Sequence, residues 1–225
     1  RADGGAGRII GFDRCAGGYR AAPEQGYPMI DLPEWPGARS ATPRVLDFGG
    51  FLEPSSGAQV QRINRLGSRY AIAITMPPLD NQKLGRIWVN RLIRGRQEGA
   101  RLPYPLLDFD PGAPGSFVVD GAGQSGKVLS ISGGTSYYAF KEGQPFSLEV
   151  GGQHYLDFIA EPVIADATGA ADIILTQMLR VEPADGDALH VAKPMIEGFV
   201  MGDPTSWEIS LDRLFGLSFE IQEAR

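Results

Sequence analysis

The chain has 225 residues, enough for one or two domains with a substantial core, and a formal net charge of −6 at pH 7. This acidic balance argues against a general nucleic-acid binder, which needs an excess of Lys and Arg to contact phosphates. The single cysteine, Cys15, excludes an internal disulfide framework and a cysteine-only metal cage, and we expect no metal site and no cofactor.

Residues 1–28 are rich in Gly, Ala and Arg and carry apolar side chains only in small groups. Such a composition has little capacity to form a core, so we predict a flexible N-terminal arm over 1–28. Met29 opens the segment MIDLPEWPG and is a plausible native start. No apolar run reaches the roughly 18 residues of a membrane span, so we expect no membrane anchor.

A mixed β/α domain is predicted over residues 29–110. The segment 69–76 (RYAIAITM) alternates between two faces, which is the period of a β-strand, and two prolines end it. Asp80 is a suitable N-cap for a helix over Asn81–Glu98, with a glycine just past its end. The apolar stripe expected to pack on the strands consists of Leu84, Trp88 and Leu92.

The same helix carries an excess of positive charge. Two interpretations remain open for these cations: a solvated helix face, or a contact with acidic groups of a neighbouring subunit. Cations in the last turn also suit the helix dipole. The helix residues that we take as candidates for a subunit interface are Arg86, Arg94 and Arg96.

Short apolar runs alternate with turn residues through 127–195. Residues 146–150 (FSLEV) have a period of two, and a Gly-Gly pair separates them from the next apolar run at hairpin spacing. Strands spaced roughly 8–12 residues apart predict an inserted small β-barrel or sandwich over 111–205. Strands within 206–225 are expected to pair back with the first domain and complete it.

The predicted fold is therefore mainly β (α+β). It consists of a β-sandwich or barrel-like domain with one amphipathic helix, which carries a second small β-barrel-like domain.

The glycine-rich segment 121–127 (GAGQSGK) matches two phosphate-binding patterns almost completely. Phosphate binding by either pattern needs a helix directly after the glycines, whereas an alternating strand sequence follows here. Val128 also replaces the Ser or Thr whose hydroxyl would hold Mg²⁺. We interpret the segment as a loop between strands. Its further candidates for a subunit interface are Gly121, Gly123, Gly126 and Lys127.

The remaining polar residues give little indication of a catalytic or metal-binding site. His154 and His190 lack a Cys, Asp or Glu at metal-ligand spacing, so we interpret both as strand-surface residues. Paired aspartates serve glycoside hydrolysis only when folding places them about 5–9 Å apart across a cleft. Each Asp pair here stands beside Pro or Gly, which favours turns, so we assign no catalytic residues. Aromatic residues offer an alternative, a carbohydrate-binding face formed by Tyr137, Tyr138 and Tyr155 with Phe140 and Phe158.

Several sequence segments, taken together in their order along the chain, carry a resemblance to a known family. They are VLDFGGFLEP with QRINRLGSRYAIAITMPPL, LLDFDPGAPGSFVVDGAGQSG, KEGQPFSLEVGGQHYL, LRVEPADGDALHVAKP and SWEISLDRLFGLSFEIQEA. Over about residues 29–225 the chain resembles minor tail and distal-tail (tail-tip) proteins of long non-contractile-tailed bacteriophages, prophages and gene transfer agents. The resemblance implies a β-rich virion protein, assembled in the bacterial host cytoplasm. It implies a ring of identical copies, hexameric in number, that joins the tail tube to the hub or baseplate.

The expected function is therefore structural rather than enzymatic, because the matching segments contain no family active site. The expected partners are copies of the chain itself, the tail tube protein and the hub or baseplate proteins, without sequence-specific binding of nucleic acid. Two alternatives stay open: a receptor- or carbohydrate-binding module at the tail tip, and a cell-wall hydrolase.

Overall fold

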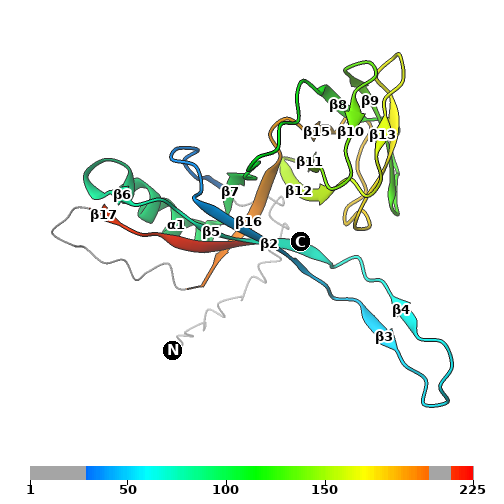
Figure 1. Ribbon diagram of the computed structural model, residues 1–225, viewed down its shortest axis with the longest axis horizontal. Coiled ribbons are helices and arrows are strands. Elements are labelled where there is room, and N and C mark those ends of the chain that lie inside the picture. Colours follow the sequence, from blue (N-terminus) through cyan, green and yellow to red (C-terminus); the bar gives the residue numbers. More distant parts are fainter. Residues whose placement is uncertain (1–28, 203–213, 225) are drawn as a thin grey trace, which may run out of the picture.

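The computed structural model describes residues 29–202 and 214–224 (Figure 1). The predicted arm over 1–28 lies outside these residues. Two six-stranded sheets and one α-helix dominate the described part, which confirms the prediction of a mainly β fold with a single helix. Figure 1 shows three parts: a sheet with the helix, a barrel of strands, and a long hairpin that extends away from both.

The first sheet has the order β1-β7-β16-β18-β5-β2. β1 runs parallel to β7, and the other neighbours are antiparallel. The strands are β1 (Ile30–Asp31), β2 (Ser40–Leu46), β5 (Arg69–Thr75), β7 (Ala100–Pro103), β16 (Met195–Met201) and β18 (Ser218–Glu223). The C-terminal strand β18 pairs with β16 and β5 in the interior of the sheet, so the first and last described strands, β1 and β18, belong to the same sheet.

The helix α1 (Arg86–Glu98) packs on this sheet. Trp88 and Leu92 are fully buried and Leu84 is partly buried, which confirms the predicted stripe. The predicted start was wrong in one respect, because a π-helical turn, η1 (Asn81–Gly85), precedes the α-helix. The N-cap position of α1 is therefore Gly85, which forms no side-chain cap, rather than Asp80.

The second sheet has the order β12-β11-β15-β8-β9-β14, with antiparallel neighbours throughout. Its two outer strands meet: Ile159 and Leu175 form a β-bridge, and the Ala160 N–H donates to the Ile174 carbonyl over 2.8 Å. The sheet thus closes into a barrel around its own core. Its strands are β8 (Gly115–Val119), β9 (Val128–Gly134), β11 (Pro145–Val150), β12 (Gln153–Phe158), β14 (Ala171–Ile174) and β15 (Ala188–His190).

The expected inserted range 111–205 differs from the observed connectivity at one strand. β16 falls inside this range, yet it pairs with β7 and β18 of the first sheet. Its alternating sequence suits a strand in either sheet, and only the tertiary pairing assigns it. The remaining short pairs are β10 (Ala139–Phe140) with β13 (Val163–Ile164), β6 (Leu79–Asp80) with β17 (Leu214–Phe215), and β3 (Gly50–Leu52) with β4 (Gln61–Ile63).

Within the described ranges, no helix has both the length and the apolar character to cross a membrane.

Candidate assembly interface

A two-stranded ribbon over residues 47–66 projects from the molecule (Figure 1). We call this ribbon the arm; it is distinct from the N-terminal arm that the sequence predicts over 1–28. β3 and β4 pair antiparallel within it, and every residue of both strands is exposed. The arm continues the pairing of β2 with β5, whose last pair is Leu46 with Arg69. It is therefore the outer end of a long hairpin whose base lies in the first sheet.

The arm exposes large apolar side chains. Its exposed members are Phe48, Phe51 (63% exposed), Leu52, Val60, Ile63 and Leu66. An isolated two-stranded hairpin has marginal stability in water, and contiguous exposed apolar surface marks protein–protein contact sites. The arm is therefore a candidate contact surface.

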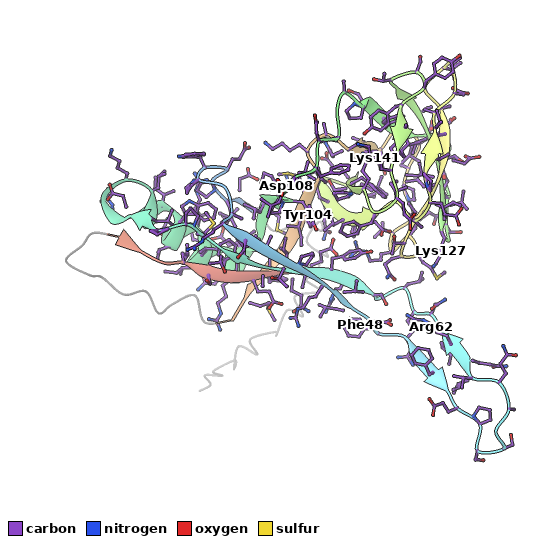
Figure 2. All side chains as sticks on the ribbon, in the orientation of Figure 1. Phe48, Arg62, Tyr104, Asp108, Lys127 and Lys141 are labelled. Atoms are coloured by element: carbon purple, nitrogen blue, oxygen red, sulfur yellow. The ribbon has the colours of Figure 1, made fainter. Side chains whose placement is uncertain are left out.

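Polar contacts give the arm a defined shape at its base. The Asp47 carboxylate accepts hydrogen bonds from the Gly49 N–H (2.8 Å) and the Ser68 hydroxyl (3.0 Å), and it pairs with Arg62 across the ribbon (2.6 Å). The hydrogen bond from Gly49, followed by that from Ser68, lowers the pKa of Asp47 and keeps this group charged. The Arg62 guanidinium also lies over the Phe51 ring, 5.4 Å from its centroid. Figure 2 shows Arg62 on the arm.

The strand edge beside the arm is partly protected against strand addition. Among the described residues β2 ends the first sheet, and most of its residues are exposed. An unpaired edge can pair with another chain, but Pro43 lies in the middle of β2 and has no N–H to donate. Side chains of the arm, more than the backbone of β2, are therefore the candidate contact groups.

A shallow apolar groove lies between the first sheet and the barrel. It has a volume of about 280 Å³ and is lined by Ala41, Pro43, Tyr104, Leu107, Phe109 and Phe158. A second groove of about 310 Å³ shares the segment 104–107. Leu107 is 55% exposed at this surface, and Figure 2 shows Tyr104 and Asp108 between sheet and barrel. The groove has the volume and apolar lining to accept apolar side chains from another molecule.

The predicted helix cations are all exposed on α1. Arg94 forms an (i, i+4) ion pair with Glu98 over 3.0 Å, and this hydrogen bond raises the pKa of Arg94. Arg86 and Arg96 are exposed on the same helix. Figure 1 places α1 and the barrel strands β8 and β9 in different parts of the molecule, so the structure does not bring these cations together with the loop 121–127.

The loop 121–127 joins β8 to β9, and a strand begins at Val128. The side chain of Gln124 holds the loop: its amide group donates to the Asp120 carbonyl (2.8 Å), and its oxygen accepts from the Ser130 N–H (2.7 Å). Gly121, Gly123 and Gly126 have positive φ angles of 91°, 78° and 89°, which glycine tolerates best. Lys127 is exposed and donates to the Thr176 carbonyl over 3.4 Å. These loop glycines shape a turn between strands.

The aromatic residues do not form one sugar-binding face. Tyr138 and Phe140 pack in the barrel core, and the Tyr138 hydroxyl donates to the Pro111 carbonyl over 2.7 Å. Tyr155 lies under the Arg180 guanidinium, 5.5 Å away, whereas Tyr137 is 68% exposed in a turn. Phe158 packs instead against the core of the first sheet.

Two features are not predicted from the sequence. One is the arm, whose apolar residues flank glycine- and serine-rich turns. The interpretation of His154 as a surface residue was wrong: it is only 5% exposed, and the Glu149 carboxylate lies near both histidines. Glu149 and His190 are far apart in sequence, and only the strand register brings them together.

Comparison of the sequence with protein-family models gives no match, and comparison with curated proteins gives none either.

Proposed function

We propose that this protein is a structural component of a phage-like tail tip, a distal-tail or minor tail protein. It assembles into a ring that joins the tail tube to the hub or baseplate, within a virion put together in the bacterial host cytoplasm. The observation that carries the proposal is the arm, an ordered hairpin with large apolar side chains in water. The order of the sequence segments that carry the resemblance to tail proteins also supports the proposal.

The proposed occupant of the contact is a second copy of the chain. The arm extends away from the described sheet and barrel, which leave its large apolar residues exposed, so a second molecule can bury them (Figure 1). Every copy also carries the apolar groove around Leu107. An arm on one side and a groove elsewhere form a head-to-tail contact, and repetition of such a contact closes into a ring when the rotation between copies allows it. The resemblance gives six as the expected number of copies.

The test compares assembly of the full chain with that of two variants by mass photometry. Phe51→Ser with Leu52→Ser removes two apolar side chains from the arm, and Ile164→Ser removes an equally exposed one (67%) from the barrel. We expect the wild type and Ile164→Ser to form the same closed oligomer, and the arm variant to remain monomeric with an unchanged circular dichroism spectrum. A wild type that stays monomeric up to its solubility limit contradicts the proposal, as does an arm variant that assembles normally.

A further inference from the structure

Three neighbouring strands of the barrel bring two histidines and one carboxylate together. β12, β11 and β15 are adjacent, and their register pairs Glu149 with His154 and Ser147 with His190. Alternate residues of β11 point into the barrel core, so Ser147 and Glu149 share the outer face. In the part of the chain that the structure describes, these two histidines and Glu149 are the one group of three such ligand residues within 4.8 Å of one another.

We propose that Glu149, His154 and His190 bind one divalent transition-metal ion of the zinc class. Imidazole nitrogen and carboxylate oxygen are common ligands of such ions. Ligand atoms about 2.0 Å from one ion at tetrahedral angles lie about 3.3 Å from each other. The observed distances from the Glu149 Oε2 atom to Nε2 of His190 and of His154 are 2.8 and 4.0 Å, which lie on either side of that spacing.

A second layer of contacts orients the buried histidine. Nδ1 of His154 lies 3.4 Å from the Ser147 hydroxyl oxygen, which also accepts a hydrogen bond from the Met195 N–H over 2.9 Å. In the tautomer with its proton on Nδ1, the Nδ1–H group donates to Ser147, and the unprotonated Nε2, which lies 4.0 Å from Glu149 Oε2, is available to bind a metal. Metal-binding histidines commonly make such an outer hydrogen bond, which fixes their tautomer and orientation.

The surroundings tolerate a cation. The nearby Arg101 guanidinium is paired with Glu197 over 2.6 Å and donates to the Gly152 carbonyl, so its charge is balanced. The Glu149 carboxylate therefore remains to offset one of the ion's two positive charges. The side chains of Glu149 and His190 are 35% and 37% exposed, which gives an ion a path from solvent and leaves room for water as a further ligand.

The same residues do not make a nucleophilic site. A serine, a histidine and a glutamate occur here in the order of a proton relay. Ser147 is, however, fully buried, and its oxygen is engaged with Met195, so a substrate cannot approach it. Metal binding uses the exposed side of the cluster and needs no access to Ser147.

The experiment uses the full chain, freed of metal with a chelator, in a Cys15→Ser background that removes the one thiol. Equilibrium dialysis against Zn²⁺ with elemental analysis gives stoichiometry and affinity, and Co²⁺ absorption reports the coordination geometry. The variants are His190→Ala and Glu149→Gln, both at half-exposed positions, with Glu142→Gln as an exposed control in the same barrel. Thermal unfolding followed by circular dichroism verifies that each variant folds.

We expect one Zn²⁺ per chain and an intense, tetrahedral-type Co²⁺ spectrum. Both ligand variants should weaken binding by at least about 100-fold and abolish that spectrum, whereas Glu142→Gln should match the wild type. Ser147→Ala should weaken binding by about 10-fold, the size of effect seen for outer-layer partners of metal ligands. No binding by the wild type overturns the proposal, and so does binding that persists unchanged in either ligand variant.

Discussion

At the scale of single residues, a buried ion pair joins the barrel side of the molecule to the first sheet. Arg180 contacts both carboxylate oxygens of Glu223, at 2.6 and 3.0 Å, and donates to the Leu156 carbonyl at 2.8 Å. The Glu223 carboxylate also accepts from the N–H groups of Tyr70 (2.7 Å) and Leu156 (2.8 Å). Every contact joins elements that are distant in sequence, so this pair fixes the relative position of strands β5, β12 and β18.

Replacement of Arg180 by Leu should lower the free energy of unfolding by about 3–5 kcal/mol, because it leaves the Glu223 carboxylate buried without its counter-ion. The matched control is Arg94→Leu, which breaks the solvent-exposed pair with Glu98 and should cost less than about 1 kcal/mol. Urea denaturation of both variants measures the difference. Equal losses of unfolding free energy in the two variants would contradict the expectation that the buried Arg180 pair stabilises the fold more than the exposed Arg94 pair.

Asp157 makes stability depend on pH. Burial raises its pKa to about 6, against the opposing hydrogen bonds from the Phe158 N–H and the Tyr70 hydroxyl. A carboxyl whose pKa is higher in the folded state than in the unfolded state binds its proton more tightly when folded. Its contribution to stability is therefore present at low pH and lost as pH rises through about 4 to 6.

The Asp157→Asn variant lacks this titration. The free energy of unfolding of the wild type, relative to that of the variant, should fall by up to about 3 kcal/mol between pH 4 and pH 7. Urea denaturation at several pH values, at low protein concentration, measures the change. A difference that stays constant with pH, or that grows as pH rises, contradicts the assignment.

At the scale of elements, close helix–sheet packing depends on a glycine. A Cβ atom added at Gly95 of α1 would lie 2.8 Å from the Cβ of Ala100 and 3.1 Å from Val200 Cγ2. We expect Gly95→Ala to destabilise the fold by about 1–3 kcal/mol, despite the better helix propensity of Ala. The exposed helix position Asn90 provides the control, since Asn90→Ala should be neutral or slightly stabilising. Thermal unfolding compares the two, and a Gly95→Ala protein more stable than the wild type would refute close packing.

A charge placed in the groove around Leu107 should affect assembly separately from changes in the arm. Leu107→Arg places a charge at an exposed position of the apolar surface, so it should prevent oligomer formation while the stability of the monomer changes by less than about 0.5 kcal/mol. Leu107→Met keeps the apolar volume and should assemble normally. Sedimentation velocity of both variants checks this. Normal assembly of the arginine variant would remove the groove from the contact.

Elements with a strong local sequence pattern could be predicted from the sequence. The alternation through 69–76 and the stripe of Trp88 and Leu92 need only neighbouring residues to be recognised, and both are present. The π-turn before α1 was not predictable, because its sequence continues the helical pattern. The partners of β16 and the meeting of Glu149 with His190 depend on register between distant strands, which periodicity within a single strand does not specify.

At the scale of the whole molecule, the chain leaves the first sheet after β7, builds the barrel, and returns through β16 and β18. The arm also belongs to the first sheet through β2 and β5. The buried Arg180–Glu223 pair and the shared packing of Leu156 and Phe158 tie the barrel to this sheet. A fixed angle between the arm and the groove is what ring closure requires, because a variable angle would permit open chains of copies.

Electron microscopy of assembled tail particles that contain this chain tests the proposed ring most directly. We predict a ring of copies coaxial with the tail tube at its tip, with the arm of each copy against the groove near Leu107 of the next. Particles in which the chain is monomeric, or forms a ring that leaves every arm in solvent, would contradict the proposed arm-to-groove contact.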